Sequence, residues 1–339
     1  MSILFVTGCN SFIGEKLCQR LLSEGHEVHG LVTHESHAKV EGVKTHRSDL
    51  MNFTGIQNIL EEVKPEFIVH LAARTEVEKS FYEPVDFSLI NYGGSVNLIE
   101  KAKHLENLKL FIFASTMETY GEVHTKEEVL DPKVKKLPFD ENTPQRPNAP
   151  YSVAKIGVEY YLRYAKRAYN FPFTAFRQTN SYGRHDNDFF VVEQIITQML
   201  KNPDEVRFGY KHPWRNFLYI DDLIDLYTKA MSHPEKVNGE FFCTGPANAI
   251  RIEDLATKIA EMLGYEGKIL WDTKPERVGE IYYLNSTPEK AYRVLGWKPK
   301  TSLDEGLKKT INQWKSKLSQ KKSSAYTSSP HRGLEKTFE

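Results

Sequence analysis

The sequence has few cysteines, no excess of either charge and no long apolar run. Its three cysteines, Cys9, Cys18 and Cys243, form no CxxC pair, which argues against a disulfide framework and is typical of a reducing cytoplasm. The 45 basic residues balance the 45 acidic residues, so charge gives no reason to expect nucleic acid or a membrane as partner. The longest apolar runs, such as residues 110–114, are too short to span a membrane. No basic segment precedes the apolar residues that begin at Ile3, so we expect a cytoplasmic protein without a signal peptide.

Apolar runs instead alternate with segments of helical spacing along much of the chain. We expect strands at residues 3–6, 27–32, 67–71, 109–114 and 173–177, and helices at 13–22, 53–63, 85–103, 151–169, 190–200, 222–231, 252–263 and 303–315. Apolar strands that alternate with amphipathic helices indicate a parallel sheet covered on both faces. The predicted fold class is therefore α/β, with a doubly wound parallel sheet.

The 339 residues are enough for this core and a smaller second lobe. We expect residues 1–180 to form mainly the sheet domain, with segments at about 210–245 returning to it, and residues 181–318 to form mainly the second lobe. The segment 122–150 contains five prolines and many charges, which predicts a surface loop near the site. Residues 319–339 lack an apolar period, which predicts a disordered tail.

The stretch TGCNSFIG follows the first predicted strand and opens the first predicted helix. In a first βα turn that binds a dinucleotide, one glycine permits the bend, a second lets the backbone approach the pyrophosphate, and a third packs helix against strand. Gly8 and Gly14 fill the first and third places, and Ser11 stands where the second is expected. The Ser11 hydroxyl could donate to a phosphate oxygen at the helix N-terminus. Alone this pattern is weak, because such glycines also serve ordinary turns.

The end of the second predicted strand should carry an acid that binds the ribose diol, but this strand ends in Thr33 and His34. Thr33, His34 and Ser36 could instead donate to a 2′-phosphate, which favours NADP over NAD, although Glu35 could still serve as the acid. We interpret His34 and His37 as part of a solvated loop, because one HxxH pair makes a poor metal site. We therefore expect no metal.

Two later stretches carry candidate chemistry. Ser115 and Thr116 end an apolar strand, and Tyr151 and Lys155 lie one turn apart on one helix face, which Asn148 is expected to cap. A tyrosine with a pKa of about 10 is a poor base at neutral pH, so a nearby ammonium is needed to stabilise the phenolate. YxxxK alone arises often by chance. Its place after a strand that ends in Ser-Thr makes the combination specific.

These stretches resemble the extended short-chain dehydrogenase/reductase family, in its nucleotide-sugar epimerase/dehydratase branch. The resemblance runs from about Ile3 to Trp314. It is carried by TGCNSFIG, SDL at 48–50, HLAA at 70–73, ASTMETYG, YSVAK, RQTNSYG at 177–183, RNFLYIDD at 215–222, and RVGE followed by LGWKPKTSLDEGL. It implies a Rossmann-type sheet that binds tightly held NADP or NAD, and a C-terminal α/β lobe that binds a nucleotide sugar.

The resemblance also implies roles for individual residues. The expected cofactor-binding residues are Gly8, Asn10, Ser11, Phe12, Ile13, Gly14, Thr33, His34, Asp49, Leu50, Leu71, Ala72, Ala73, Tyr151 and Lys155. The expected substrate-binding residues are Ser115, Thr116, Asn180, Arg215 and Arg277. Arg215 and Arg277 match arginines that clamp the nucleotide diphosphate, which suits the paired donors of a guanidinium.

The expected catalytic residues are Thr116, Glu118, Tyr151 and Lys155. By resemblance, Tyr151 takes the proton of the sugar C4 hydroxyl while hydride leaves C4 for the nicotinamide. Glu118 matches the residue that removes the C5 proton and assists loss of water from C6 in sugar 4,6-dehydratases, after which hydride returns to C6. Met117 departs from the aspartate of several dTDP-sugar dehydratases and agrees with the GDP-mannose group. The sequence thus favours a 4,6-dehydratase, a lyase.

Other activities of the branch remain open at this point. They are a nucleotide-sugar 4-epimerase, a UDP-glucuronate decarboxylase and a 4-keto-sugar reductase, and a non-catalytic cofactor-binding protein is a further alternative. The helices predicted at 85–103 and 151–169 match those that pair as a four-helix bundle in the dimers of the family, so we expect a homodimer. Arg184 departs from the usual Tyr-Gly-Pro pattern, because it follows Tyr182 and Gly183.

Overall fold

The structure of the chain is a computed structural model that describes residues 1–33 and 37–327. Its main sheet has seven parallel strands in the order β11-β6-β5-β4-β1-β2-β3. Their bounds are β1 (Ile3–Thr7), β2 (Glu27–Val32), β3 (Lys44–Arg47), β4 (Phe67–His70), β5 (Leu110–Thr116), β6 (Phe173–Gln178) and β11 (Glu240–Cys243). The strand order reverses direction beside β1, where a doubly wound sheet binds its ligands. The predicted α/β class is confirmed.

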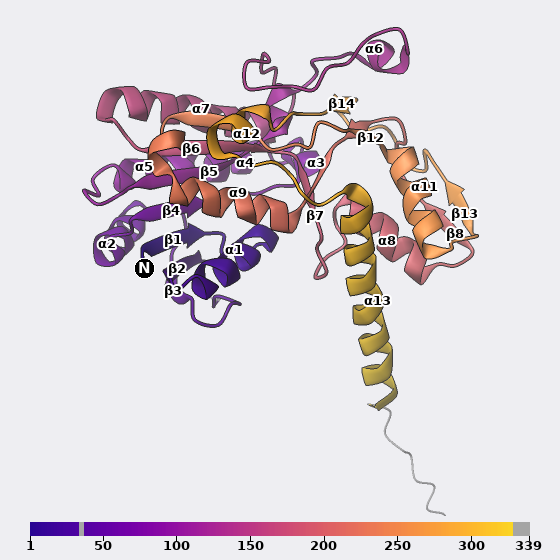
Figure 1. Cartoon of the computed structure of the whole chain (residues 1–339), viewed down its shortest axis with the longest axis horizontal. Coiled ribbons are helices and arrows are strands. Elements are labelled where there is room, and N and C mark those ends of the chain that lie inside the picture. The colour runs from indigo at the N-terminus through magenta and orange to yellow at the C-terminus, as the bar shows by residue number, and fades with distance from the viewer. Residues whose placement is uncertain (34–36, 328–339) are drawn as a thin grey trace, which may run out of the picture.

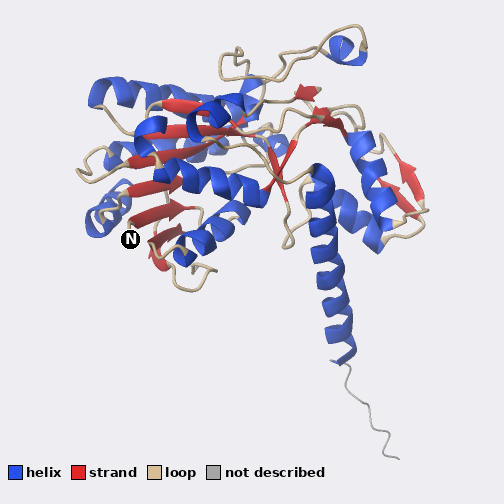
Figure 2. Ribbon diagram, viewed as in Figure 1, coloured by secondary structure: helices blue, strands red, loops and turns tan. Residues whose placement is uncertain are grey.

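Helices cover both faces of this sheet (Figure 2). Side chains alternate along β1, so that Leu4 and Val6 pack in one core with the helices α1 (Phe12–Ser23) and α9 (Ile220–Ser232). Phe5 packs in the other core, with the helices α2 (Phe53–Val63), α5 (Gly94–Ala102) and α7 (Pro150–Tyr169). Both cores are mainly apolar, which explains the predominantly apolar sequences of the central strands.

A second group of elements lies at one end of the molecule (Figure 1). It contains one three-stranded sheet, one two-stranded sheet and the helices near them. Its elements include β8 (Glu205–Arg207), β9 (Trp214–Arg215), β12 (Ile250–Arg251), β13 (Lys268–Leu270), β14 (Tyr283–Leu284), α8 (Val191–Lys201) and α11 (Ile252–Leu263). Between them and the main sheet, β7 (Asn180–Tyr182) pairs with β10 (Phe217–Tyr219). The division of the chain at residue 180 stays a prediction, and α9 and β11 lie with the main sheet.

The helix predicted at 85–103 is interrupted in the structure. It consists of α4 (Pro84–Ser88), one π-helical turn at Leu89–Gly93, and α5. The π turn presents Asn91, whose side chain accepts a bond from the backbone N–H of Arg74 and donates one to its carbonyl, at 2.8 and 2.9 Å. A π turn holds one extra residue, and here that irregularity fixes the chain that follows β4. The helical spacing of the sequence does not reveal it.

The predicted tail and surface loop also differ from the structure. Helix α13 spans Leu303–Thr327 and extends away from the molecule (Figure 1), so residues 319–327 are helical and residues 328–339 lie outside the described part. Leu307, Ile311 and Trp314 anchor the helix in the core, and the absence of proline and glycine from 319–327 lets it continue. The 122–150 segment contains the short helix α6 (Lys126–Leu130), and its Phe139 is buried.

Candidate active site

The turn between β1 and α1 forms a close-packed cradle. Gly8 has a φ of +70°, and a Cβ there would lie 2.8 Å from the backbone nitrogen of Ala72. A Cβ at Gly14 would lie 2.2 Å from the carbonyl oxygen of Gly8. Ser11 is the N-cap of α1, since its hydroxyl accepts a bond from the Gly14 N–H at 3.1 Å. The Ser11 O–H hydrogen is then still available to a phosphate, as are backbone N–H groups of the first turn.

Other expected cofactor residues gather around this turn at the carboxyl edge of the sheet. The Ala72 N–H donates to the Thr7 hydroxyl at 3.2 Å, which brings the end of β4 against the end of β1. Asn10 donates to the His37 carbonyl at 2.8 Å and accepts from the Lys39 N–H at 2.9 Å, so it holds the chain that follows β2. These contacts join three strand ends into one surface. The glycine cradle and the helix N-terminus fit the pyrophosphate of a dinucleotide.

The remaining cofactor residues lie along the same edge. Thr33 is exposed at the end of β2, while His34, together with Glu35 and Ser36, lies outside the described residues. Asp49 is exposed and accepts a bond from the Met51 N–H at 2.7 Å. Thr33 and Asp49 are the described residues that we expect to contact the adenosine half of the cofactor. The others, half-buried or buried, are Phe12, Ile13, Leu50, Leu71 and Ala73.

Thr116, Glu118 and Tyr151 meet where β5 ends and α7 begins. Thr116 is the last residue of β5 and caps a 3₁₀ turn, because its hydroxyl accepts a bond from the Glu118 N–H at 3.2 Å. Burial raises the pKa of Tyr151, and the nearby charge of Glu118 raises it further, while a hydrogen bond to Thr116 lowers it. The Oε2 atom of Glu118 is buried and has no hydrogen-bond partner among the described residues. An acid with a free oxygen thus faces the site.

Lys155 lies one turn after Tyr151 on α7, as the spacing predicts. Its Nζ atom donates to the Ala114 carbonyl at 2.8 Å. Lys155 is 3% exposed, and burial lowers its pKa to about 7. That the Lys155 ammonium stabilises a Tyr151 phenolate stays a prediction. Burial thus disfavours the charged form of both side chains when no ligand is bound.

Ser115 was expected to bind substrate, and the structure corrects this expectation. Its hydroxyl donates to Glu159 Oε1 at 2.6 Å. Glu159 also pairs with Arg177, with 2.8 Å between Oε2 and Nη2, and both side chains are 1% exposed. Arg177 in turn donates to the Tyr120 hydroxyl at 2.9 Å. Ser115 therefore belongs to a buried network that holds β5, β6 and α7 together, and its hydroxyl hydrogen is already used.

Asn148 was expected to cap α7, but the cap residue is Ala149. Pro150 begins the helix, because its ring fixes a helical φ and it has no N–H to satisfy, so the residue before it becomes the cap. Ser152 completes the cap by accepting from the Ala149 N–H at 3.2 Å. Asn148 instead donates to the Gly279 carbonyl at 3.1 Å. It thus ties the start of α7 to the segment that contains Gly279.

The two arginines expected to clamp a diphosphate lie around one carboxylate. Arg215 Nη2 is 2.7 Å from Glu280 Oε1, and Arg277 Nε is 3.4 Å from Glu280 Oε2. One negative charge between two guanidinium groups leaves a net positive charge, which suits a phosphate ligand. Arg277 Nε is buried, and its N–H donates no hydrogen bond to any of the described residues. Asn180, also expected to bind substrate, is half-buried on β7 and donates to the Asn216 carbonyl at 3.4 Å.

Sequence reasoning assigned no role to Glu280 or to the contact of Asn148 with the second lobe. The spacing Arg277-x-x-Glu280 was a signal for the first, because it permits an ion pair of side chains three residues apart. No local signal marks the second, because 131 residues separate Asn148 from Gly279. The structure brings Glu280 beside both arginines and Asn148 against Gly279.

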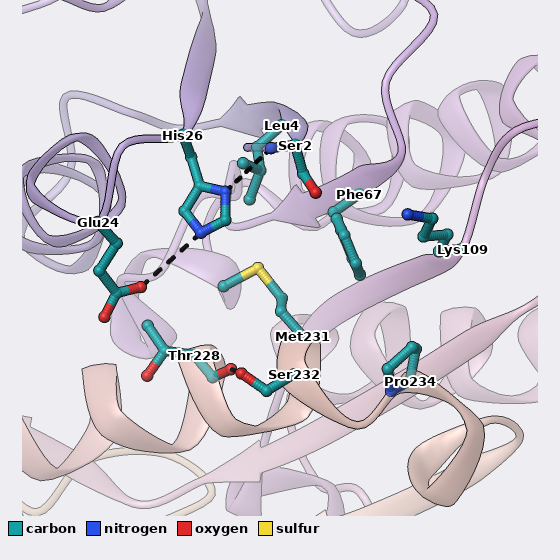
Figure 3. Close-up of a pocket in the computed structure, with 10 residues that line it drawn as sticks. All are labelled: Ser2, Leu4, Glu24, His26, Phe67, Lys109, Thr228, Met231, Ser232 and Pro234. Atoms are coloured by element: carbon teal, nitrogen blue, oxygen red, sulfur yellow. Dashed lines mark hydrogen bonds and ion pairs between the residues drawn. The ribbon is translucent and has the colours of Figure 1, made fainter.

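A cavity of about 310 Å³ opens at the opposite edge of the main sheet (Figure 3). Its lining includes His26, Phe67 and Lys109, which lie at the amino ends of strands, and none of the expected site residues. The described residues contain no group of three or more side chains placed to hold a metal ion. No helix within that part of the chain is long and apolar enough to cross a membrane.

Comparisons with known proteins agree with this geometry. The chain is similar to UDP-glucose 4-epimerase of Thermotoga maritima, solved with UDP-glucose, with 31% identity and a TM-score of 0.82 over 93% of this chain and 99% of that one. It is similar to the Thermus thermophilus UDP-glucose 4-epimerase in complex with NAD, with 25% identity and a TM-score of 0.81 over 92% and 98% of the two chains. Human dTDP-D-glucose 4,6-dehydratase is 26% identical over 289 residues, which are 83% of this chain and 77% of that protein.

A family model described as GDP-mannose 4,6 dehydratase matches residues 5–310. This match covers most of the chain and includes the glycine cradle, the residues Thr116, Tyr151 and Lys155, and the two arginines Arg215 and Arg277. It confirms the resemblance inferred from the motifs. The chain therefore belongs to the GDP-mannose 4,6 dehydratase family, in the nucleotide-sugar epimerase/dehydratase branch of the extended short-chain dehydrogenases/reductases.

Proposed function

We propose that the protein is a nucleotide-sugar 4,6-dehydratase, which converts its substrate to a 4-keto-6-deoxy sugar nucleotide. The observation that carries this proposal is Glu118, whose Oε2 atom is buried without a hydrogen-bond partner among the described residues and whose charge acts on Tyr151. A buried carboxylate with a free oxygen is costly unless a ligand uses it. A second acid–base group beside Tyr151 is what elimination of water requires and what a simple epimerisation does not.

Each residue of the site has a defined task in this reaction. Tyr151 removes the proton of the C4 hydroxyl, and Thr116 holds the same oxygen by a hydrogen bond. Lys155 favours the deprotonated form of Tyr151 when it carries its charge. Glu118 removes the proton at C5, which the C4 ketone makes acidic, and gives that proton to the departing C6 hydroxyl, which leaves as water. Tyr151 then returns the proton that it took from the C4 hydroxyl to C5, as the hydride returns to C6. A bound nicotinamide supplies the acceptor and donor of the hydride.

The cofactor is a nicotinamide dinucleotide, as in the NAD-bound relative. We further propose tight binding, which a reaction that returns its hydride in every cycle favours, and NADP in preference to NAD because no acid ends β2 in the described residues. Arg215 and Arg277 supply the positive charge that would hold the diphosphate of the substrate. Cytoplasmic location stays a prediction.

A homodimer is also part of this proposal. The outer surfaces of α4 and α7 expose large apolar side chains, among them Val85 at 66%, Val153 at 54% and Tyr160 at 64%. Contiguous exposed apolar side chains of this kind commonly mark an interface. Pairing of two copies through these helices would form the four-helix bundle that the sequence suggested.

A 4-epimerase is the second candidate, since the similarity to the Thermotoga maritima enzyme reaches 31% identity. Epimerisation would use Tyr151 and the hydride transfer at C4 but would leave Glu118 without a chemical task. The two activities are therefore separated by the product and by the effect of changing Glu118.

The test incubates the purified protein with GDP-mannose, dTDP-glucose, UDP-glucose and UDP-glucuronate in turn, without added cofactor. We expect mass spectrometry to show loss of one water from one of them. An unchanged mass with a new sugar configuration by NMR would establish the epimerase, and loss of carbon dioxide from UDP-glucuronate would establish a decarboxylase. Turnover of a 4-keto sugar only with added NADPH would identify a reductase.

The variant Glu118→Gln tests the role of this side chain. Because general acid–base groups contribute roughly 10²- to 10⁴-fold to rate, we expect it to lower dehydration by at least about a hundredfold while cofactor binding is kept. Glu122→Gln is the matched control, since Glu122 is an exposed glutamate on the same segment. Normal dehydration by Glu118→Gln would refute the role assigned to Glu118.

A further inference from the structure

Arg184 lies beside the turn expected to hold the cofactor, although it departs from the family pattern. We propose that its guanidinium group binds the pyrophosphate of the dinucleotide, a contact that rests on the nicotinamide dependence of the proposed function. Arg184 lies beside the start of α1, it donates only one side-chain hydrogen bond within the described residues, and Glu193 fixes the backbone of its loop.

The position of Arg184 places its charge next to the first turn of α1. The guanidinium carbon lies 4.3 Å from the ring centre of Phe12 and 3.9 Å from that of Phe190. Phe12 is the first residue of α1 and directly follows Ser11, the N-cap. A cation stacked on Phe12 therefore stands at the helix end that already favours anions.

Arg184 is buried but only partly satisfied. It is 7% exposed, and within the described residues its side chain donates one hydrogen bond, from Nη1 to the Ser181 carbonyl at 2.6 Å. The nearest carboxylate oxygen, Oε2 of Glu193, lies 3.8 Å away, beyond hydrogen-bond distance, and is itself without a hydrogen-bond partner there. Since a guanidinium has several N–H donors in a planar fork, most of its binding capacity is left for a ligand.

Glu193 forms its hydrogen bonds with the backbone of the loop and none with the guanidinium group of Arg184. Its Oε1 atom accepts bonds from the backbone N–H groups of Gly183 and Arg184, both at 3.0 Å. Burial raises the pKa of Glu193 and lowers that of Arg184, because each charge is removed from water. The carboxylate thus fixes the backbone of the turn, and it does not fully neutralise the arginine in its vicinity.

The same loop also reaches the chain on the other side of the cradle. Asp186 acts electrostatically on Lys39, and Lys39 Nζ lies 2.6 Å from Glu15 Oε1 on α1. Lys39 is the residue whose backbone N–H is bound by Asn10. Asp186 therefore lies near enough to the segment that follows β2 to act on its Lys39, and Arg184 contacts α1 at Phe12. A phosphate bound at this end of α1 would therefore lie close to the guanidinium group of Arg184.

Two departures from the family pattern thus meet at Phe12. Ser11 stands where a glycine would let the backbone approach the pyrophosphate most closely, and its hydroxyl oxygen already caps α1. Arg184 stands where the family usually has proline. We infer that the guanidinium supplies phosphate contacts that the serine-containing turn offers less directly. A pyrophosphate presents paired oxygens that suit the planar donors of arginine.

The experiment compares Arg184→Met with the wild-type protein after the cofactor has been removed. Methionine keeps a long apolar side chain between Phe12 and Phe190 but removes the charge. Affinities are measured by calorimetry or competition for ADP-ribose, which carries the pyrophosphate, and for adenosine, which does not. Arg20→Met is the matched control, because Arg20 lies on α1 and its side chain is 52% exposed.

We expect Arg184→Met to weaken binding of ADP-ribose by about ten- to a hundredfold, the usual effect of a hydrogen bond to a charged group, and to leave adenosine binding unchanged. Arg184→Lys should retain part of the affinity, because lysine keeps the charge without the paired donors. Equal losses for both ligands, or no loss for either, would overturn the proposal and assign Arg184 to packing alone.

Two controls keep the result interpretable. If Arg184→Met does not fold, the ratio of the two affinities in Arg184→Lys decides, since a several-fold loss confined to ADP-ribose supports the proposal and an unchanged ratio overturns it. If the wild-type protein binds neither NAD, NADP nor ADP-ribose, the nicotinamide-dependent function itself fails. Normal binding of these ligands by Arg184→Met would remove only the inference about this arginine.

Discussion

Burial of Lys155 should make the stability of the protein depend on pH in a defined way. The side chain is 3% exposed, and burial lowers its pKa from 10.5 to about 7. A change of this size corresponds to about 5 kcal/mol against the charged form. The folded protein without cofactor therefore carries this cost in full below pH 7, and the cost falls gradually as the pH rises from 7 toward 10.5.

The sign follows from proton binding in the two states. Between pH 7 and pH 10.5 the unfolded chain keeps a proton on Lys155 that the folded protein has largely released, so the free energy of unfolding rises with pH in that window. The contribution of Lys155 should increase by about 2 kcal/mol from pH 7 to pH 9. Below pH 7 both states are protonated, and the cost of burial is then nearly constant.

Urea unfolding of cofactor-free protein measures this effect. The wild-type protein is compared with Lys155→Met from pH 6 to pH 10, and the exposed Lys308 is changed to Met as a control. The difference between wild type and Lys155→Met should move by about 2 kcal/mol in favour of the wild type between pH 7 and pH 9. The Met variant also leaves the Ala114 carbonyl without its donor, which shifts the difference by a constant amount. A difference that does not change with pH would refute the argument.

Other predictions concern the core network, the cradle and the dimer. Glu159→Gln removes the charge that pairs with the buried Arg177 and should lower the free energy of unfolding by about 3 kcal/mol in urea; no change would mean that the pair contributes little. Gly14→Ala introduces a Cβ 2.2 Å from a backbone oxygen and should lower both Tm and cofactor affinity, whereas Gly209→Ala, with open space around it, should change neither. Tyr160→Glu should shift the protein toward monomers in sedimentation velocity, and an unchanged dimer would place the interface elsewhere.

Much of the main sheet could be predicted because its signals are local. The helices at Phe53–Val63 and Ile252–Leu263 have the predicted bounds, since their apolar residues recur at helical spacing over a full face. The strands of the smaller lobe could not be predicted in the same way. Residues 214–215 form a strand by pairing with residues 283–284, and two residues are too few to carry a period.

In the candidate site, too, local features could be predicted from the sequence, whereas contacts with distant residues could not. Tyr151 and Lys155 could be placed on one helix face by their spacing alone. Ser115 and Asn148 could not be assigned correctly, because their partners are Glu159 and the Gly279 carbonyl, which lie 44 and 131 residues away. Sequence spacing within one element predicts which side chains share a face. It does not reveal which of them the fold has already occupied with a distant partner.

Three of the ten buried side-chain polar atoms that lack a hydrogen-bond partner among the described residues lie near the expected site. Glu118 Oε2, Asn148 Oδ1 and Arg277 Nε are all buried without a hydrogen-bond partner among the described residues. They lie in three segments that meet, because Asn148 precedes Tyr151 on the chain and binds Gly279, two residues after Arg277. Buried polar groups without partners reduce stability, so these three atoms would each gain a hydrogen bond from a polar ligand bound beside them. An acid, an amide and a guanidinium in this order suit a sugar at the acid and a phosphate at the arginine.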